Sequence, residues 1–255
     1  MFKKSNFLFL FLCCGPVFAQ ALSLADPVLS SAWSGTNISA GGVVSTGNTN
    51  AQNANAASNI FYAKKKWALS SNDTFNFART EGSGVTASKL FLSGQAQYNF
   101  AIKNYSFLEA DYTDDRFDGY QYILNSIAGY GRRLVNQPRF SWDIQGGPGI
   151  QHSVKKSQEE SSDSDNSGLT QNNFLLNAST QMALTLSQNS SITENFSVVS
   201  TRINTRTIST TAITANLINR FAMQLSFQAI HDSLPLNTKK NLNTITTLSL
   251  VYTLA

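Results

Sequence analysis

The sequence predicts an all-β protein, a transmembrane antiparallel up-and-down β-barrel of about 12 strands. Apolar and polar residues alternate in long segments such as 89–100, where Leu90 and Leu92 share one face and Gln95 and Gln97 share the other. These segments are roughly 10–13 residues long, near the length of about 9–11 residues that crosses a bilayer and about twice the average soluble strand. Charged residues make up only 13% of the chain, against about 25% in soluble domains.

The N-terminus has the organisation of a secretory signal peptide. Lys3 and Lys4 precede an apolar run at residues 7–14, and small residues suitable for cleavage follow. The apolar run is too short to span a bilayer as a helix. We predict that residues 1–19 are removed, with cleavage after residue 21 as the alternative, and that residues 20–32 form a short periplasmic leader before a single barrel domain.

Both cysteines, Cys13 and Cys14, lie inside this signal. A lipoprotein is an alternative, but the large residues Phe11 and Leu12 stand where a lipobox has small ones. The mature chain then has no cysteine, which excludes a disulfide scaffold, a thiol nucleophile and a Cys-based metal site. The formal net charge of +4 falls to +2 without Lys3 and Lys4, and nothing in it points to nucleic acid.

The first three strands are predicted at residues 33–44, 53–63 and 67–79. A Gly-Asn dipeptide in "STGNTN" marks the turn between the first two, and the lysines at 64–66 mark the connection to the third. The third strand places Trp67 on the same face as its other large apolar residues.

The next three strands are predicted at residues 89–100, 105–115 and 120–132. "IKN" and "RFDG" separate them. In the second of the three, apolar residues alternate with Glu109 and Asp111, so the two carboxylates share one face of the strand.

The seventh and eighth strands are predicted at 140–151 and 172–186. A turn at 133–139 precedes the seventh strand, in which Asp143 belongs to the polar row. The one long polar loop, "VKKSQEESSDSDNSG", lies between the two strands.

The last four strands are predicted at 191–202, 207–218, 221–231 and 243–254, the first two of them on the weakest alternation. Tight connections then alternate with longer polar loops, which predicts an outer-membrane barrel with both termini in the periplasm. The tight connections are expected at 64–66, 101–104, 133–139, 187–190 and 218–221.

Aromatic residues cluster near the predicted strand ends, as an interfacial girdle requires. A secreted β-sandwich is the rival, and it leaves the strand length unexplained. Many outer-membrane barrels end on an aromatic residue, whereas this chain ends on Leu254 and Ala255. The girdle is expected to contain Trp33, Trp67, Phe100, Tyr105, Tyr120, Tyr130, Phe140, Trp142 and Phe221.

The segments "WSGTNISAGG", "LFLSGQAQYNF", "DYTDDRFDGYQY", "GYGRRL", "QGGPGI" and "LSLVYTL" resemble the salt-induced outer-membrane proteins, domain-of-unknown-function family 481. The resemblance covers roughly residues 33–255, and residues 45–49 and 115–119 are its most specific parts. It implies a Gram-negative outer-membrane barrel and carries no catalytic or binding residues.

Candidate enzymatic residues are few. His152 and His231 are the only histidines, and both are expected at the outer ends of strands. His231-Asp232 and Asp114-Asp115 resemble the pairs of outer-membrane proteases, but adjacent residues of a strand point to opposite faces. We therefore expect no catalytic site.

Two further features have alternative explanations. Asp163, Asp165 and Ser167 match the start of an EF-hand loop, but Phe174 stands where the bidentate Glu is required. The alternative is a plain polar surface loop, so we expect no metal and no cofactor. Basic residues at the expected outer rim either bind lipopolysaccharide phosphates or only aid solubility: Arg79, Lys155, Lys156, Arg202, Arg206, Lys239 and Lys240.

The lumen is expected to carry Asp73, Glu109, Asp111 and Asp143, with no basic partner at mid-depth. An acidic ring in a narrow pore favours cations, so we predict a narrow passive, cation-preferring pore or an envelope-stress component of the outer membrane. The alternatives are a non-conducting structural barrel and an outer-membrane enzyme acting on lipid or peptide. The expected partners are membrane lipid, lipopolysaccharide and the outer-membrane assembly machinery; the sequence leaves the oligomeric state open.

Overall fold

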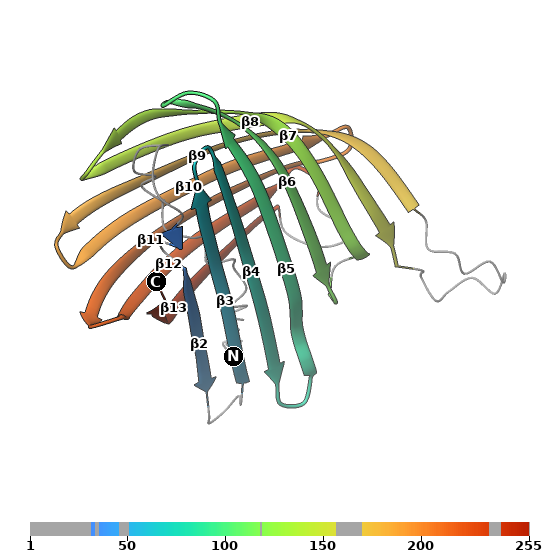
Figure 1. The fold of residues 1–255 in the computed structure, drawn as a ribbon. Coiled ribbons are helices and arrows are strands. Elements are labelled where there is room, and N and C mark those ends of the chain that lie inside the picture. The colour runs from blue at the N-terminus through green and yellow to red at the C-terminus, as the bar shows by residue number, and fades with distance from the viewer. Residues whose placement is uncertain are drawn as a thin grey trace, which may run out of the picture.

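The twelve long strands of the chain close into one antiparallel barrel (Figure 1). A computed structural model describes residues 32–33, 36–45, 51–117, 119–156, 170–234 and 241–254 of the 255-residue chain. Each strand from β2 to β13 pairs with the next one in sequence, and β13 pairs back to β2. The two-residue β1 pairs with β3. The strands are β1 (Ala32–Trp33), β2 (Asn37–Ser45), β3 (Ala51–Lys64), β4 (Trp67–Thr80), β5 (Gly84–Asn99), β6 (Asn104–Asp115), β7 (Tyr120–Gln137), β8 (Phe140–Lys155), β9 (Thr170–Ser187), β10 (Ser190–Thr201), β11 (Thr205–Ile218), β12 (Phe221–Asp232) and β13 (Leu242–Thr253).

The predicted fold class and the predicted number of strands are confirmed. Even the two strands with the weakest alternation, β10 and β11, lie within two residues of their predicted bounds. The signal peptide and the leader to residue 31 lie outside the described residues. Among the described residues no helix is long and apolar enough to cross a membrane.

One predicted turn is wrong, and the error concerns the lumen. Residues 133–137 were expected in a turn but continue β7, and only Pro138 and Arg139 connect β7 to β8. The pairing of β7 with β8 contains a register shift between Arg133 and Val135 and then continues to Gln137. The polar residues at the end of the strand resemble a loop in sequence, although their backbone pairs with β8.

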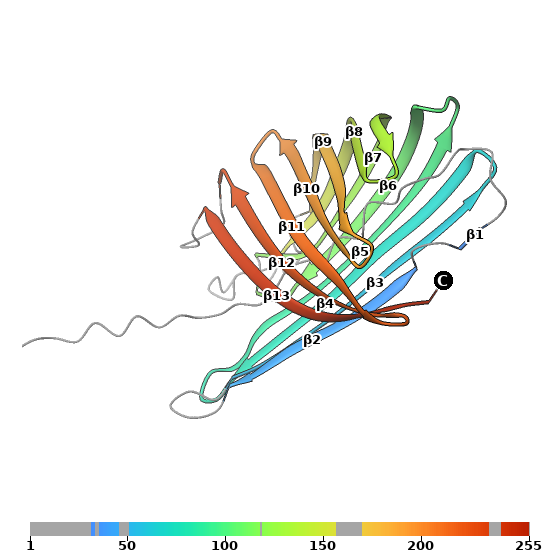
Figure 2. The ribbon, with the colours of Figure 1, turned by 90° about the vertical axis from the view of Figure 1, so that its left-hand side faces the viewer.

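The two ends of the barrel differ, as Figure 2 shows from the side. At one end, here called the turn end, short connections join the strands and β2 begins and β13 ends. Two of these connections are two-residue turns in which Lys65 and Asn219 adopt positive φ of 55° and 51°, as the mirror-image turns of tight hairpins require. The opposite end, here called the loop end, carries the other connections, including the long one after β8.

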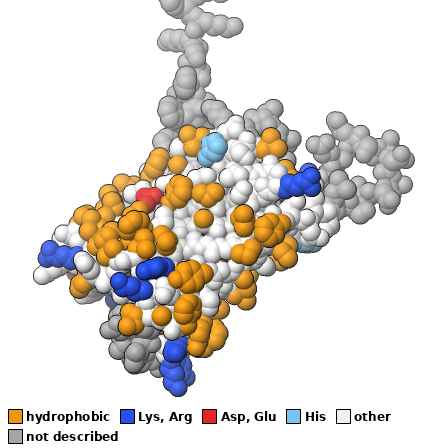
Figure 3. Space-filling model, turned by 90° about the horizontal axis from the view of Figure 1, so that it is seen from above, with side chains coloured by type: hydrophobic (Ala, Val, Ile, Leu, Met, Phe, Trp, Pro, Cys, Tyr) orange, Lys and Arg blue, Asp and Glu red, His pale blue; other side chains and the backbone are white. Residues whose placement is uncertain are grey.

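The outer face of the barrel is apolar. Leu108, Leu176, Leu225 and Leu248, from four different strands, are 48–60% exposed. Hydrophobic side chains are spread over the face in Figure 3, with Lys and Arg mostly near its margins. Leu92 also points outward and is 40% exposed. An extended apolar surface of this kind is suited to contact with lipid.

The inner face is mainly polar, and contacts across the lumen identify it. Gln95 Nε2 on β5 donates to Gln145 Oε1 on β8 at 3.3 Å, although β6 and β7 separate the two strands. Both side chains must therefore point inward. Because directly opposed residues of antiparallel strands share a face, the registers extend this assignment around the barrel.

The barrel closes through a short seam. β13 pairs with β2 over four residue pairs, from Leu250 opposite Ala40 to Thr253 opposite Asn37. A Cβ at Gly41 would stand 2.6 Å from the Leu248 carbonyl oxygen. Glycine at position 41 therefore permits the close approach of the two strands on which closure depends.

Candidate functional site in the lumen

Glu109 and Asp111 lie side by side on the inner face of β6. Glu109 is opposite Gln95 on β5, and Asp111 is opposite Ser93. The two carboxyl groups contact each other, and Asp111 also contacts the Ser93 hydroxyl. Among the described residues, no basic side chain acts on either carboxyl group. Two carboxyl groups therefore lie together without a basic partner from the described residues.

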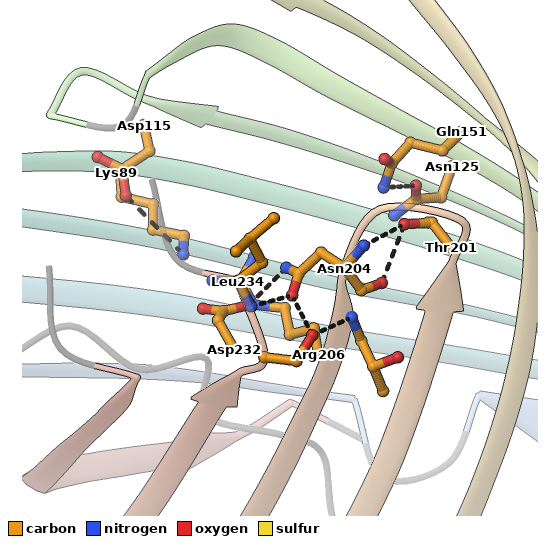
Figure 4. A network of polar contacts seen from close by, with 11 residues as sticks. Lys89, Asp115, Asn125, Gln151, Thr201, Asn204, Arg206, Asp232 and Leu234 are labelled. Carbon is orange, nitrogen blue, oxygen red and sulfur yellow. Dashed lines mark hydrogen bonds and ion pairs between the residues drawn. The ribbon is translucent and has the colours of Figure 1, made fainter. Parts of the chain in front are cut away.

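The lumen carboxylates near the loop end are paired with basic residues. Lys89 Nζ lies 4.0 Å from Asp115 Oδ2, and Arg206 Nε lies 3.4 Å from Asp232 Oδ1. Figure 4 shows both pairs, together with Asn204, whose Nδ2 donates to Asp232 Oδ1 at 3.1 Å. These charges are internally balanced.

Asp143 is also balanced, which the sequence prediction missed. It lies directly opposite Arg133, which is only 4% exposed. Arg133 donates to Asn99 Oδ1 at 2.7 Å and to the Ile102 carbonyl at 3.1 Å, and its guanidinium lies 5.1 Å from the ring centre of Tyr105. The expected absence of a basic partner is therefore wrong, because Arg133 belongs to β7 and not to a turn.

The structure places Asp73 on the outer face, so its prediction as a lumen residue is wrong. Asp73 is opposite the outward Leu92 and in phase with Phe75, which is 45% exposed. Ser58 and Ser71 each donate to its carboxylate at 3.1 Å. The even spacing from Phe75 fixes this orientation, and the two hydroxyls satisfy the charge where lipid cannot.

Glu194 is a second outward carboxylate, and the sequence prediction did not identify it. It shares the outer face of β10 with Phe196, which is 40% exposed. Ser209 donates to Glu194 Oε1 at 2.7 Å, and Thr211 donates to its other oxygen. Glu194 is in phase with Ile192 and Phe196, and this alternation could have indicated its outward orientation.

An apolar cluster lies beside the acidic pair inside the barrel. Tyr105, Phe107, Ile127 and Leu175 are each at most 4% exposed and pack together, with Val199 against them. We call these five side chains the apolar wall. Tyr105 was predicted in the outer aromatic girdle, and this is wrong because it alternates with the outward Leu108.

Glycines on the facing strands provide the room for this wall. A Cβ at Gly131 would overlap the Tyr105 ring, and one at Gly149 would stand 2.9 Å from Leu175 Cδ1 and 3.0 Å from Ile127 Cγ1. The bulky residues of the wall thus depend on small residues in β7 and β8.

Many buried polar atoms of the lumen have no hydrogen-bond partner among the described residues. Buried polar groups are normally hydrogen-bonded to protein or to ordered water. These atoms include Ser39 Oγ, Asn59 Oδ1, Thr74 Oγ1, Asp111 Oδ1, Arg133 Nε, Asp143 Oδ1, Gln171 Oε1, Asn177 Oδ1, Thr193 Oγ1, Gln224 Oε1 and Gln228 Oε1.

The histidines do not meet a carboxylate in the described residues. His152 faces outward, where its ring contacts the Tyr122 hydroxyl at 3.3 Å and Asn172 Oδ1 at 2.7 Å. His231 is opposite Thr207, whereas the adjacent Asp232 points inward to Arg206.

The predicted metal loop at Asp163, Asp165 and Ser167 lies outside the described residues, as do Lys239 and Lys240. Within the described part of the chain, no three His, Cys, Asp or Glu side chains gather as a metal site.

A closed antiparallel barrel with an apolar outer face and a polar lumen is the fold of outer-membrane β-barrels. The chain belongs to the family described as protein of unknown function DUF481, whose model matches residues 38–254. The uncharacterized protein YdiY from Escherichia coli (strain K12) is 26% identical over 224 residues, which cover 86% of this chain and 82% of YdiY.

Two solved barrels share the fold at low sequence identity. The NanC porin has a TM-score of 0.52 at 7% identity, over 86% of this chain and 100% of NanC. The translocator domain of autotransporter NalP from Neisseria meningitidis has a TM-score of 0.50 at 10% identity, over 86% of this chain and 87% of that domain. These similarities concern the fold.

Proposed function

We propose that this protein is a narrow passive pore of the outer membrane that prefers cations. The observation that carries the proposal is the unbalanced pair Glu109 and Asp111 on the inner face of β6. The other three lumen carboxylates among the described residues, Asp115, Asp143 and Asp232, each face a basic residue. The net charge that a passing ion meets is therefore negative at this pair.

The position of the pair increases its influence. Charges act more strongly inside a protein than in bulk water, because the effective dielectric constant is lower and salt screens them less. A ring or cluster of carboxylates in a narrow pore concentrates cations and excludes anions. Polar side chains of the inner face such as Gln95 and Gln145 support a hydrated path beside the pair.

The proposal includes the orientation of the barrel. The short connections, the start of β2 and the end of β13 lie at the turn end, which in outer-membrane barrels faces the periplasm. The loop end would then meet lipopolysaccharide, and basic residues there such as Arg79 would meet its phosphates. Insertion by the outer-membrane assembly machinery belongs to the same proposal.

The rival functions are a non-conducting structural barrel and an outer-membrane enzyme. Twelve strands fall between the filled barrels of about eight strands and the open porins of about 16. The number of strands therefore does not decide between a pore and a non-conducting barrel. The separation of His152 and His231 from lumen carboxylates gives no support to hydrolytic chemistry, and we propose that the protein is not an enzyme.

Single-channel recording of the purified protein in planar bilayers tests the proposal. Steady, voltage-independent current steps are expected in potassium chloride. A barrel that is folded by circular dichroism but electrically silent would favour the structural reading. Turnover of added phospholipid or peptide by the same preparation would instead favour the enzyme.

A further inference from the structure

We propose that one side of the turn end binds the headgroups of anionic phospholipids. Exposed basic side chains lie at three neighbouring turns, those between β3 and β4, between β5 and β6, and between β7 and β8. The inference goes beyond the proposed pore, because it depends on the barrel lying in a membrane and not on conduction. The basic residues at these turns, with one on the adjoining outer face of β7, are here called the basic rim: Lys64, Lys65, Lys66, Lys103, Arg132 and Arg139.

The charge of the basic rim is not balanced by other described residues. The three turns contain no Asp or Glu. None of the six basic side chains forms an ion pair within the described part of the chain. At the loop end, in contrast, the described basic residues are mixed with Glu81, Asp114 and Asp115. Positive charge is therefore concentrated on one side of the turn end.

Backbone hydrogen bonds hold the three turns in one arc. Each turn accepts a bond at one of its carbonyl oxygens from an amide of the next strand around the barrel, β5, β7 or β9. The cations of the three turns thus have a fixed order along the rim. The three bonds run from Asn99 to Lys66 at 2.7 Å, from Arg133 to Lys103 at 2.8 Å and from Thr185 to Arg139 at 2.9 Å.

An aromatic band lies on the membrane side of the basic rim. The ring centres of Trp67 and Tyr98 are 5.0 Å apart, and those of Phe100 and Tyr130 are 6.1 Å apart. Trp67, Phe100 and Tyr130 are 48–55% exposed. Trp67 begins β4 directly after the lysines of its turn, and Tyr130 is two residues from Arg132 on the outer face of β7. Because exposed aromatic rings mark the level where hydrocarbon meets headgroups, the basic rim lies at headgroup depth.

The short turns favour a lipid headgroup over a soluble acidic partner. Lys65 adopts positive φ in a two-residue turn, and only Pro138 and Arg139 connect β7 to β8. The cations therefore stay close to the aromatic band. Lys and Arg can lay their apolar stems along such a surface while their charged heads reach lipid phosphates. In the orientation proposed above, these lipids belong to the periplasmic leaflet.

Quenching of Trp67 fluorescence by brominated lipids tests the proposal. Trp33→Phe and Trp142→Phe leave Trp67 as the only tryptophan of the parent protein. The parent is placed in phosphatidylcholine nanodiscs that contain a minor fraction of brominated phosphatidylglycerol or brominated phosphatidylcholine. Phosphatidylglycerol should bind beside Trp67 about fivefold more tightly, the effect of one basic residue near an anionic surface. Sodium chloride at about 1 M should bring the ratio of the two affinities toward one.

Two matched triple variants identify the basic residues responsible. Lys64→Gln, Lys66→Gln and Lys103→Gln together should bring the ratio of affinities close to one. The control variant removes three exposed cations of the loop end and should match the parent. Circular dichroism and heat-dependent gel migration establish that each variant is folded. The control substitutions are Arg79→Gln, Arg116→Gln and Arg202→Gln.

Several outcomes would overturn the inference. These are equal quenching of the parent by the two brominated lipids, an unchanged ratio in the variant of the basic rim, and an equal loss in the loop-end control. Inorganic phosphate should lower the ratio no more than sodium chloride of the same ionic strength, and a larger effect would indicate a site for free phosphate. Displacement of brominated phosphatidylglycerol by poly-L-glutamate would indicate a soluble acidic partner and refute the lipid.

Discussion

Arginine placed on the outer face tests both the lipid contact and the orientation of Asp73. Leu225 lies in the middle of β12, is 48% exposed, and is opposite the apolar residues Ile213 and Leu248. Leu225→Arg should therefore destabilise the folded barrel by about 2–4 kcal/mol, the effect of a cation near the bilayer midplane of a barrel. Leu92 has similar exposure, 40%, but its environment differs.

Asp73 lies directly opposite Leu92, and directly opposed Cβ atoms are about 4.5–5.5 Å apart. An arginine at position 92 therefore reaches the Asp73 carboxylate. A hydrogen bond between charged groups contributes about 1.5–3 kcal/mol. Leu92→Arg should accordingly cost about 1.5–3 kcal/mol less than Leu225→Arg, and Asp73→Asn should remove that advantage.

The assay is reversible denaturant unfolding of the barrel in lipid vesicles, followed by tryptophan fluorescence. A double-mutant cycle of Leu92→Arg and Asp73→Asn isolates the coupling energy between the two positions. A cycle energy near zero would refute the outward orientation of Asp73. A negligible cost of Leu225→Arg would refute lipid contact of this face.

Three further outcomes are expected. Arg133→Met should destabilise the barrel by about 3–5 kcal/mol because it leaves a buried charge unpaired, whereas Met at the exposed Arg132 should change stability by less than about 0.5 kcal/mol; equal effects in denaturant unfolding would contradict the burial of Arg133. Gly131→Ala should cost about 1–3 kcal/mol through overlap with an aromatic ring, while Gly94→Ala, with nothing within 4 Å of the new Cβ, should be neutral or stabilising in the same assay. An epitope inserted within residues 157–169 should be stained on intact cells, and staining only after permeabilisation would invert the proposed orientation.

The strands could be predicted from the sequence because period-2 alternation extends over most of each one. Leu92 and Gln95, for example, are three residues apart and therefore point to opposite faces of the strand. This assignment depends on local backbone geometry alone and needs no partner strand. The outward orientation of Asp73 could also have been predicted from the sequence, since Asp73 is in phase with Phe75. The prediction failed there because it weighed residue polarity above spacing.

The candidate site depended on information that alternation does not contain. Arg133 was predicted in a turn because polar residues follow it, and only the pairing of β7 with β8 places it opposite Asp143. The position of Leu175 near Glu109 follows from the registers of three strand pairs. Registers are set by turns and packing together, so a single sequence predicts the strands better than their alignment.

The reversal potential in a tenfold potassium chloride gradient tests the central claim most directly. Ideal cation selectivity gives about 59 mV, and wild type should show a clear fraction of this value with the sign of a cation-preferring pore. The variant with Glu109→Gln and Asp111→Asn should move toward zero, while Asp73→Asn, which removes one carboxylate from the outer face, should match wild type. An unchanged potential in the double variant, or an anion-preferring wild type, would contradict the account.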